Sequence, residues 1–244
     1  IVSLRAGARA VAAGFLDQAH VKVTSRDEIG DVTHAFNAML EDLREKDRIK
    51  EKFGQYVDPR IVAGLLDGAQ HSSVGEKQIA TLFFSDIVKF SAIAERLAPS
   101  TLVDLMNAYF SAMSQPICEH SGIIDKYIGD AIMAFWVPPF SDPNRQAESA
   151  CRAALEQLAL LDALNRRVPD IVGLRRDVPN INFRAGLSTG EVVVGSVGSE
   201  TARSFTVMGD TVNQASRLEA ANKVYGTNVL IDHETYAAAG SAIE

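Results

Sequence analysis

The stretch DKYIGDAIMAFW, residues 125–136, decides the fold of most of this chain. Its apolar run is interrupted at Gly129-Asp130 and then resumes. A glycine-containing break of two residues between apolar runs is typical of a β-hairpin. We therefore predict two strands within residues 121–136, with Asp130 in the turn that joins them.

Outward from this hairpin, short apolar runs alternate with amphipathic stretches. We predict further strands at 79–87, at 181–198 (two strands broken at Thr189-Gly190), at 205–208 and at 228–231. Helices are predicted at 99–120, 144–164 and 211–225. Residues 166–180 contain two prolines and four arginines and predict an exposed loop. Hairpins among helices favour an α+β fold with a mostly antiparallel sheet flanked by helices.

The first 45 residues follow another pattern. Two apolar seams, each with spacings of 3 and 4, indicate two helices: Ile1, Leu4, Ala8, Val11 and Phe15, then Ile29, Val32, Phe36, Met39 and Leu43. Gly14 interrupts the first helix, and Asp27 or Ser25 is the expected cap of the second. Such narrow seams favour a coiled-coil-like bundle, although two helices packed on the following domain remain an alternative.

Residues 44–52, REKDRIKEK, carry charge at eight of nine positions. A solvated helix face accounts for this, but the apolar phase also slips here before Phe53 and Tyr56. Because a phase shift changes supercoil winding, a dimeric coiled coil that carries a rotational signal is the second interpretation. Pro59 permits a helix over 60–66, and residues 68–77 form a predicted linker.

Composition narrows the class of protein. The chain has 244 residues, of which 47% are hydrophobic and 23% charged, and this composition indicates a folded protein. Its formal net charge of −7 speaks against nucleic acid as a partner. Its two cysteines build no disulfide framework and suggest a reducing compartment. No apolar run approaches the ~18 residues of a membrane span. From its first and last residues, Ile1 and Glu244, we expect a fragment of a longer protein.

Asp86 and Asp130 are the first candidates for chemistry. Each sits at the end of a predicted strand, beside a turn, where a rigid backbone presents a side chain to a cleft. Two such carboxylates suit hard divalent cations and an in-line displacement at phosphorus, although two ordinary turn aspartates are the plainer interpretation. No GxxxxGK[ST] or HExxH motif is present, which argues against a Walker-type ATPase and a zinc hydrolase.

Four segments then occur in order: FFSDIVKFS (83–91), DKYIGDAIMAFW (125–136), FRAGLSTGEVVVGSVG (183–198) and TVMGDTVNQASRLE (206–219). Together they resemble the class III adenylate/guanylate cyclase catalytic domain, over residues 78–244. The segment DEIGDVTHAFNAM (27–39) resembles the second helix of a HAMP domain, over residues 1–45. Residues 46–77 would then be the coiled-coil or helical linker.

The resemblance implies a role for eight residues. Asp86, Asp130 and the Ile87 carbonyl match metal ligands for two divalent cations, Mg²⁺ or Mn²⁺. Phe90 matches a substrate contact, and Lys126 and Thr206 match the readers of the purine. Asn213 and Arg217 match the catalytic residues that position the ribose and stabilise the transition state. The implied reaction converts ATP to 3′,5′-cyclic AMP and pyrophosphate.

The base can also be argued from the residues. A lysine donates to a ring nitrogen of adenine, and a hydroxyl accepts from its amino group, so Lys126 and Thr206 favour ATP. Thr206 stands where better-known adenylate cyclases carry Asp, which resembles a Thr-type adenylate subgroup. A guanylate cyclase with loose purine selectivity and a non-catalytic dimerising relay are the alternatives.

The resemblance also implies partners. The metal aspartates and the Asn/Arg pair of this family come from opposite subunits, so we expect a homodimer with two shared active sites. HAMP domains usually follow a transmembrane helix, which implies a membrane anchor upstream of Ile1, a catalytic domain on the cytoplasmic side of the cell membrane and a soluble fragment. Glu191 replaces a phosphate-binding Arg of many members, Lys89 and Ser91 replace Gly and Thr, and the family's last strands are expected to lie beyond Glu244.

Overall fold

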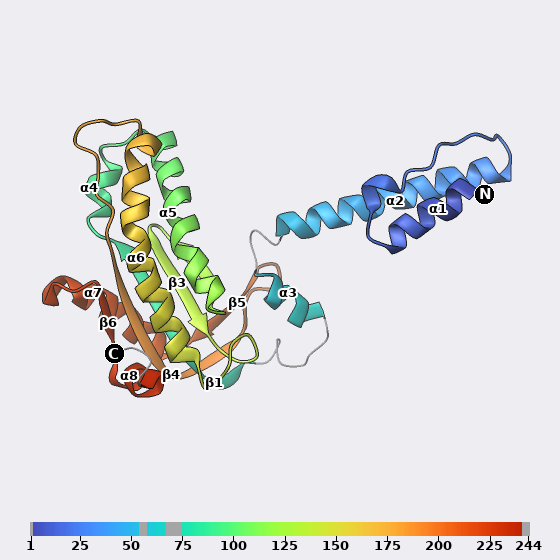
Figure 1. The fold of residues 1–244 in the computed structure, drawn as a ribbon. Coiled ribbons are helices and arrows are strands. Elements are labelled where there is room, and N and C mark those ends of the chain that lie inside the picture. The colour runs from blue at the N-terminus through green and yellow to red at the C-terminus, as the bar shows by residue number, and fades with distance from the viewer. Residues whose placement is uncertain (1, 54–57, 67–74, 241–244) are drawn as a thin grey trace. The chain divides into compact units, whose positions relative to one another are not determined.

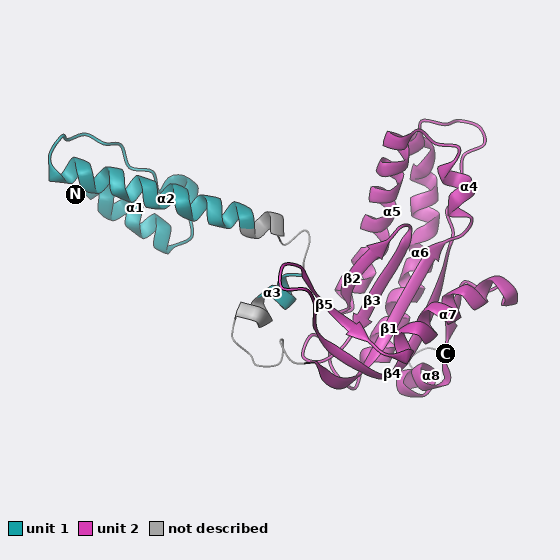
Figure 2. Cartoon of the chain, turned by 180° about the vertical axis from the view of Figure 1, so that it is seen from behind, with its two compact units in different colours: residues 1–62 teal, residues 63–244 magenta. Residues whose placement is uncertain are grey.

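The computed structural model describes residues 2–53, 58–66 and 75–240. The chain divides into two compact units, residues 1–62 and 63–244 (Figure 2). Each unit has its own packing and is described separately.

The first unit is helical. Helix α1 spans Val2–Ala12, a 3-10 turn η1 spans Leu16–Gln18, and helix α2 spans Glu28–Phe53. The cap of α2 is Asp27, whose Oδ1 accepts from the backbone N–H groups of Ile29 at 3.0 Å and Gly30 at 3.2 Å. Capping groups of this kind satisfy donors that the first helical turn leaves unpaired. Both predicted helices are therefore present.

A connector runs back along these two helices. The Asn37 side chain donates to the Val21 carbonyl at 2.7 Å and accepts from the Val21 N–H at 3.1 Å, which fastens the connector to α2. A Cβ at Gly7 would lie 2.7 Å from the Val21 side chain, so glycine permits the close approach of α1. Much of the predicted apolar seam is exposed in the single chain, at Phe15, Ile29, Val32 and Met39.

The segment between the two domains is partly described. Helix α2 continues without a break through the charged residues 44–52 to Phe53, and α3 spans Pro59–Leu66 as Pro59 predicted. Tyr56 and residues 67–74 of the expected linker lie outside the described residues. The linker prediction was wrong at its end, because Glu76 and Lys77 already pair with Val194 and Val193 in a sheet.

The second unit contains one six-stranded sheet (Figure 1). Its strands are β1 (Glu76–Ile87), β2 (Ile123–Ile128), β3 (Ala131–Trp136), β4 (Phe183–Gly198), β5 (Arg203–Met208) and β6 (Val229–Ile231). The order is β2-β3-β1-β4-β5, and β6 also pairs with β4. All neighbours are antiparallel except β4 and β6, which confirms the α+β prediction.

Helices cover both faces of this sheet. They are α4 (Phe90–Ala94), α5 (Pro99–Glu119), α6 (Gln146–Val172), α7 (Asp210–Tyr225) and α8 (His233–Ala239). Side by side, α5 and α6 lie over one face, and the main core there includes Phe83, Trp136 and Tyr109 (Figure 1). Neither α4 nor α8 was expected from the sequence.

Helix α7 packs on the other face. Alternate residues of β4 point to opposite sides, and Ala185 and Leu187 belong to the core beneath α5 and α6. Between them, a Cβ at Gly186 would lie 2.2 Å from the Ala215 carbonyl and 2.2 Å from the Glu219 amide of α7. Glycine at this position therefore lets α7 rest directly on the strand.

Two predictions for the second unit were wrong, one for residues 183–198 and one for residues 166–180. The stretch 183–198 is one continuous strand, because residues 183–194 pair with β1 and residues 193–198 pair with β5, and Thr189 and Gly190 stand opposite Thr81 and Ala80. Gly190 serves a close approach, since a Cβ there would lie 2.8 Å from the Thr211 Oγ1.

The expected loop at 166–180 is helical as far as Val172. Helix α6 runs on through Pro169, and the reason is burial on the core side. Val168 and Val172 continue the buried stripe of Leu161 and Leu164 at helical spacing.

Candidate active site

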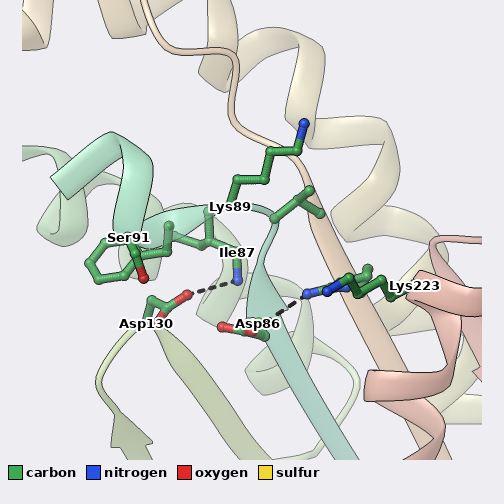
Figure 3. Close-up of a pocket in the computed structure, with 9 residues that line it drawn as sticks. Asp86, Ile87, Lys89, Ser91, Asp130 and Lys223 are labelled. Atoms are coloured by element: carbon green, nitrogen blue, oxygen red, sulfur yellow. Dashed lines mark hydrogen bonds and ion pairs between the residues drawn. The ribbon is translucent and has the colours of Figure 1, made fainter. Parts of the chain in front are cut away.

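Asp86 and Asp130 meet at one edge of the sheet. Asp86 is the penultimate residue of β1, and Asp130 lies in the turn between β2 and β3. Because β3 pairs with β1, that turn returns to the end of β1, where the Ile87 N–H donates to Asp130 Oδ2 at 3.1 Å (Figure 3). Both carboxylates line a cavity of about 330 Å³, together with Ile87, Val88, Lys89, Phe90, Ser91, Arg184 and Lys223.

The environment of Asp130 changes its protonation. Burial raises the pKa of Asp130 to about 7, and the neighbouring Asp86 carboxylate adds to this rise. Two acids held together in this way are the oxygen ligands that Mg²⁺ and Mn²⁺ prefer. The described residues contain no group of three or more His, Cys, Asp and Glu side chains that could hold a metal. Any metal here would therefore rely on two carboxylates, backbone carbonyl oxygen, water and substrate.

Arg184 completes the charge balance of the cavity, and sequence reasoning missed it. It stands opposite Asp86 in the β1–β4 register, and its Nη2 lies 3.7 Å from Asp86 Oδ2. On its other side, its Nε lies 3.4 Å from Glu219 Oε1 of α7. Burial, followed by the Asp86 charge, raises the pKa of Glu219. Only the register between two distant strands reveals this contact, so no local sequence signal could have found it.

The residues that follow Asp86 form the other wall. Phe90 lines the cavity and also packs against the main core, so its ring supports the wall. Lys89 adopts a left-handed conformation with φ of 59° at the start of α4. Its exposed side chain is directed away from Asp86 and Asp130 (Figure 3), which agrees with a solvated rather than a ligand-binding lysine.

The predicted purine readers come together elsewhere, around a third residue. Thr206 on β5 donates its hydroxyl to Asp125 Oδ2 at 2.8 Å, and Lys126 Nζ lies 3.4 Å from the same oxygen. The register of β2 against β3 shifts between Ile124 and Lys126, so Asp125 lies at a β-bulge. Asp125 was not a predicted site residue, although its position beside Lys126 within the quoted motif is a visible signal.

Asn213 and Arg217 lie on the exposed side of α7. They are one turn apart and share a face, as their spacing predicts. At 3.6 residues per turn, Arg217 points roughly 200° away from Glu219 around the helix axis. Since Glu219 contacts the cavity residue Arg184, Arg217 faces away from the Asp86 cavity of its own chain.

Comparison with known proteins gives this arrangement a family. The family model described as "Adenylate and Guanylate cyclase catalytic domain" matches residues 73–241, more than half of the chain. The chain belongs to this cyclase family. Residues 1–45 match the HAMP domain model, as the sequence predicted.

Relatives and solved structures agree with the family. Adenylate cyclase 1 of Rhizobium meliloti is 38% identical over 179 residues, which cover 73% of this chain and 26% of that protein. The terminal-differentiation-specific adenylate cyclase of Dictyostelium discoideum is 37% identical over 164 residues, which cover 67% of this chain and 7% of the relative. The chain therefore spans about a quarter or less of these two proteins.

Two crystal structures of opposite purine choice resemble the cyclase domain equally. The adenylyl cyclase CyaB from P. aeruginosa has a TM-score of 0.61 and 31% identity, and covers 68% of this chain and 82% of its own. The guanylyl cyclase Cya2 has the same TM-score and identity, and the match covers 68% of this chain and 81% of the Cya2 chain. Overall structural similarity therefore does not decide between ATP and GTP as the substrate, and this choice must be argued from side chains.

Glu191, which replaces a phosphate-binding Arg of many family members, forms an ion pair with a neighbouring strand. Lys77 Nζ lies 2.6 Å from Glu191 Oε1 across the β1–β4 ladder, and both side chains are exposed. Glu191 therefore has a cation as partner and is not among the residues that line the Asp86 cavity.

Among residues 2–53, 58–66 and 75–240, no helix combines the length and apolar composition that a membrane crossing requires.

Proposed function

We propose that this cyclase domain is an adenylate cyclase, which converts ATP to 3′,5′-cyclic AMP and pyrophosphate. The observation that carries the proposal is the convergence of Asp86 and Asp130 on one cavity, and a second cluster of the same domain brings Lys126 and Thr206 together at Asp125. The named relatives that are adenylate cyclases agree with it.

Asp86, Asp130 and the Ile87 carbonyl would hold two divalent cations, Mg²⁺ or Mn²⁺. The fit rests on chemistry, because two close carboxylates, one with a pKa raised to about 7, favour a cation between them. When bound, such cations lower the pKa of an attacking hydroxyl and neutralise a triphosphate. Arg184 keeps Asp86 directed toward the cavity and offsets part of its charge when no cation is bound.

The reaction is an in-line displacement at phosphorus. The 3′ oxygen of ATP forms a bond to the α-phosphorus, its proton passes to solvent, and the bond to pyrophosphate breaks. Arg217 donates its planar fork of N–H groups to the charge that develops on the α-phosphate. Asn213, one turn earlier on α7, orients the ribose so that its 3′ oxygen faces the phosphorus.

Base choice follows from donor and acceptor chemistry. Lys126 donates to the N1 acceptor of adenine, and Thr206 accepts from the 6-amino group. Guanine reverses both groups, with a donor at N1 and an acceptor at C6, so GTP is the poorer substrate. This arrangement corresponds to a Thr-type adenylate cyclase.

The sites are shared within a homodimer. Arg217 faces away from the Asp86 cavity of its own chain, so an arginine from a second copy completes each site and two-fold symmetry creates two of them. The exposed apolar residues Phe15, Ile29, Val32 and Met39 of the HAMP domain are the kind of seam that a dimeric bundle covers. Rotation of that bundle would regulate the sites, and a membrane anchor in the full-length protein would couple them to a signal.

Turnover of ATP and GTP tests the proposal. Full-length protein is incubated with either nucleotide in Mg²⁺ or Mn²⁺, and cyclic AMP and cyclic GMP are quantified. We expect cyclic AMP as the main product in at least one metal. Cyclic GMP as the main product would make the domain a guanylate cyclase, and the absence of both products would favour a non-catalytic relay.

A further inference from the structure

Asp125 is an unusual residue to find beneath a nucleotide-reading surface. Its side chain is only 1% exposed, and its Oδ1 is buried without a hydrogen-bond partner. The other oxygen, Oδ2, accepts the Thr206 hydroxyl at 2.8 Å and lies 3.4 Å from Lys126 Nζ. A buried carboxylate is costly to maintain, so its contact with both predicted purine readers calls for an explanation.

The backbone holds this contact in place. The bulge at Asp125 breaks the alternation of β2, and a bulge re-aims the side chains beside it. On the other strand, the ring of Phe205 packs 5.7 Å from that of Phe140 and 6.4 Å from that of Phe135, between centroids. Phe205 thus anchors β5 next to Thr206, so the hydroxyl reaches Asp125 from a fixed strand.

The contact with Asp125 decides whether the Thr206 hydroxyl donates to a nucleotide base or accepts from it. A hydroxyl has one hydrogen to donate and two lone pairs to accept with. Its hydrogen is committed to Asp125 Oδ2, which leaves only lone pairs for a nucleotide base. A free threonine could rotate and donate to the 6-oxo group of guanine, whereas this one accepts from a 6-amino group and repels a 6-oxo group.

We infer that Asp125 is a specificity-determining residue that acts through Thr206: it fixes the hydroxyl as an acceptor and so selects 6-aminopurine over 6-oxopurine triphosphates. The same carboxylate keeps the Lys126 ammonium beside the hydroxyl, which sets a donor next to the acceptor. This inference rests on the proposed function, because it deepens the base choice of that same site.

The test compares four variants with wild type in the full-length protein. Asp125→Asn keeps the shape of the side chain but supplies an amide that can donate to the hydroxyl oxygen and free its hydrogen. Thr206→Val removes the hydroxyl, and the double variant combines both changes. The matched control is Asp232→Asn, because Asp232 is also buried and accepts a hydroxyl, that of Ser188 at 2.6 Å, away from the readers.

Two ratios are measured for each protein. The first is kcat/KM for ATP divided by kcat/KM for GTP, which does not depend on the folded fraction of a preparation. The second is the ratio of calorimetric Kd values for the α,β-methylene analogues of GTP and ATP, which cannot cyclise. We expect Asp125→Asn and Thr206→Val each to lower both ratios about tenfold or more, the double variant to lower them no further, and Asp232→Asn to leave them unchanged.

Several results would overturn the inference. They are unchanged ratios in Asp125→Asn, losses that add in the double variant, or a wild type with no preference between the two analogues. If Asp125→Asn does not fold, Asp125→Ser takes its place, with the same expected loss. A wild type that forms no cyclic nucleotide would refute the proposed function alone, since the analogue affinities would still decide the role of Asp125.

Discussion

Arg184 lies directly opposite Asp86 in the β1–β4 ladder, and its guanidinium spans the space between Asp86 Oδ2, at 3.7 Å, and Glu219 Oε1, at 3.4 Å. Its side chain is 17% exposed, so its removal leaves two partly buried carboxylates facing each other. We expect Arg184→Gln to lower the free energy of unfolding by about 1–3 kcal/mol in urea titrations.

Two further variants make that prediction specific. Adding Glu219→Gln to Arg184→Gln should restore part of the lost stability, because the repulsion between the two carboxylates disappears. Arg175→Gln is the matched control, since Arg175 pairs with Asp170 at 3.7 Å with both side chains highly exposed. It should change stability by less than about 0.5 kcal/mol. Equal losses of stability in Arg184→Gln and Arg175→Gln would show that the contacts of Arg184 with Asp86 and Glu219 stabilise the fold no more than an exposed ion pair does.

Complementation between two inactive variants tests the shared sites. Asp86→Ala and Arg217→Ala should each lower cyclic AMP formation at least about 100-fold when pure. In an equal mixture, half of the dimers combine one chain of each kind, and one of their two sites is intact. The mixture should therefore recover about a quarter of wild-type turnover. A mixture no more active than its two components would place both residues in the same chain's site.

The raised pKa of Asp130 predicts a pH effect on the metal-free protein. The folded state binds this proton up to about pH 7, whereas the usual carboxyl value is 3.8, so the folded state holds more protons between these limits. The Asp130 contribution to the free energy of unfolding therefore falls as pH rises through this window. In EDTA, Asp130→Asn should be more stable than wild type at pH 8, and the difference should shrink at pH 5.

Divalent cations should make wild type more stable than Asp130→Asn at pH 8, the reverse of the order expected in EDTA. Excess Mn²⁺ at pH 8 should raise the Tm of wild type, because a ligand that binds only the folded state stabilises it. Asp130→Asn should gain much less. If wild type and Asp130→Asn respond alike to Mn²⁺ in thermal melts, Asp130 is not a ligand.

The contact between α7 and β4 predicts a strong effect at one glycine. In Gly186→Ala, the new Cβ would meet backbone atoms of α7 at 2.2 Å, so the helix that carries Asn213 and Arg217 must shift. We expect a loss of stability of about 3 kcal/mol and a clear fall in turnover. The control, Gly190→Ala, meets the Thr211 side chain and should cost about 1 kcal/mol or less, measured by urea unfolding. Similar losses in both would contradict a backbone-limited contact.

Local patterns were sufficient for part of the site. The end of β1 at Ile87 and the turn at Asp130 follow from apolar runs and turn residues, which act over a few positions. The shared face of Asn213 and Arg217 follows from helix period alone. The continuity of β4 and the extension of α6 past Pro169 did not follow from local signals, because a partner strand and a core that lie far away in sequence overrode the glycine and the proline.

Sequence alone determined that this chain carries a HAMP segment and a cyclase domain, with two acids at strand ends and with a lysine and a threonine that we propose as readers of the purine. Tertiary structure alone decided that Arg184 stands opposite Asp86 and that Asp125 holds the Thr206 hydroxyl. The physical reason is range: residue spacing encodes what a strand or helix presents, whereas strand register, a bulge and helix packing decide which distant side chains meet.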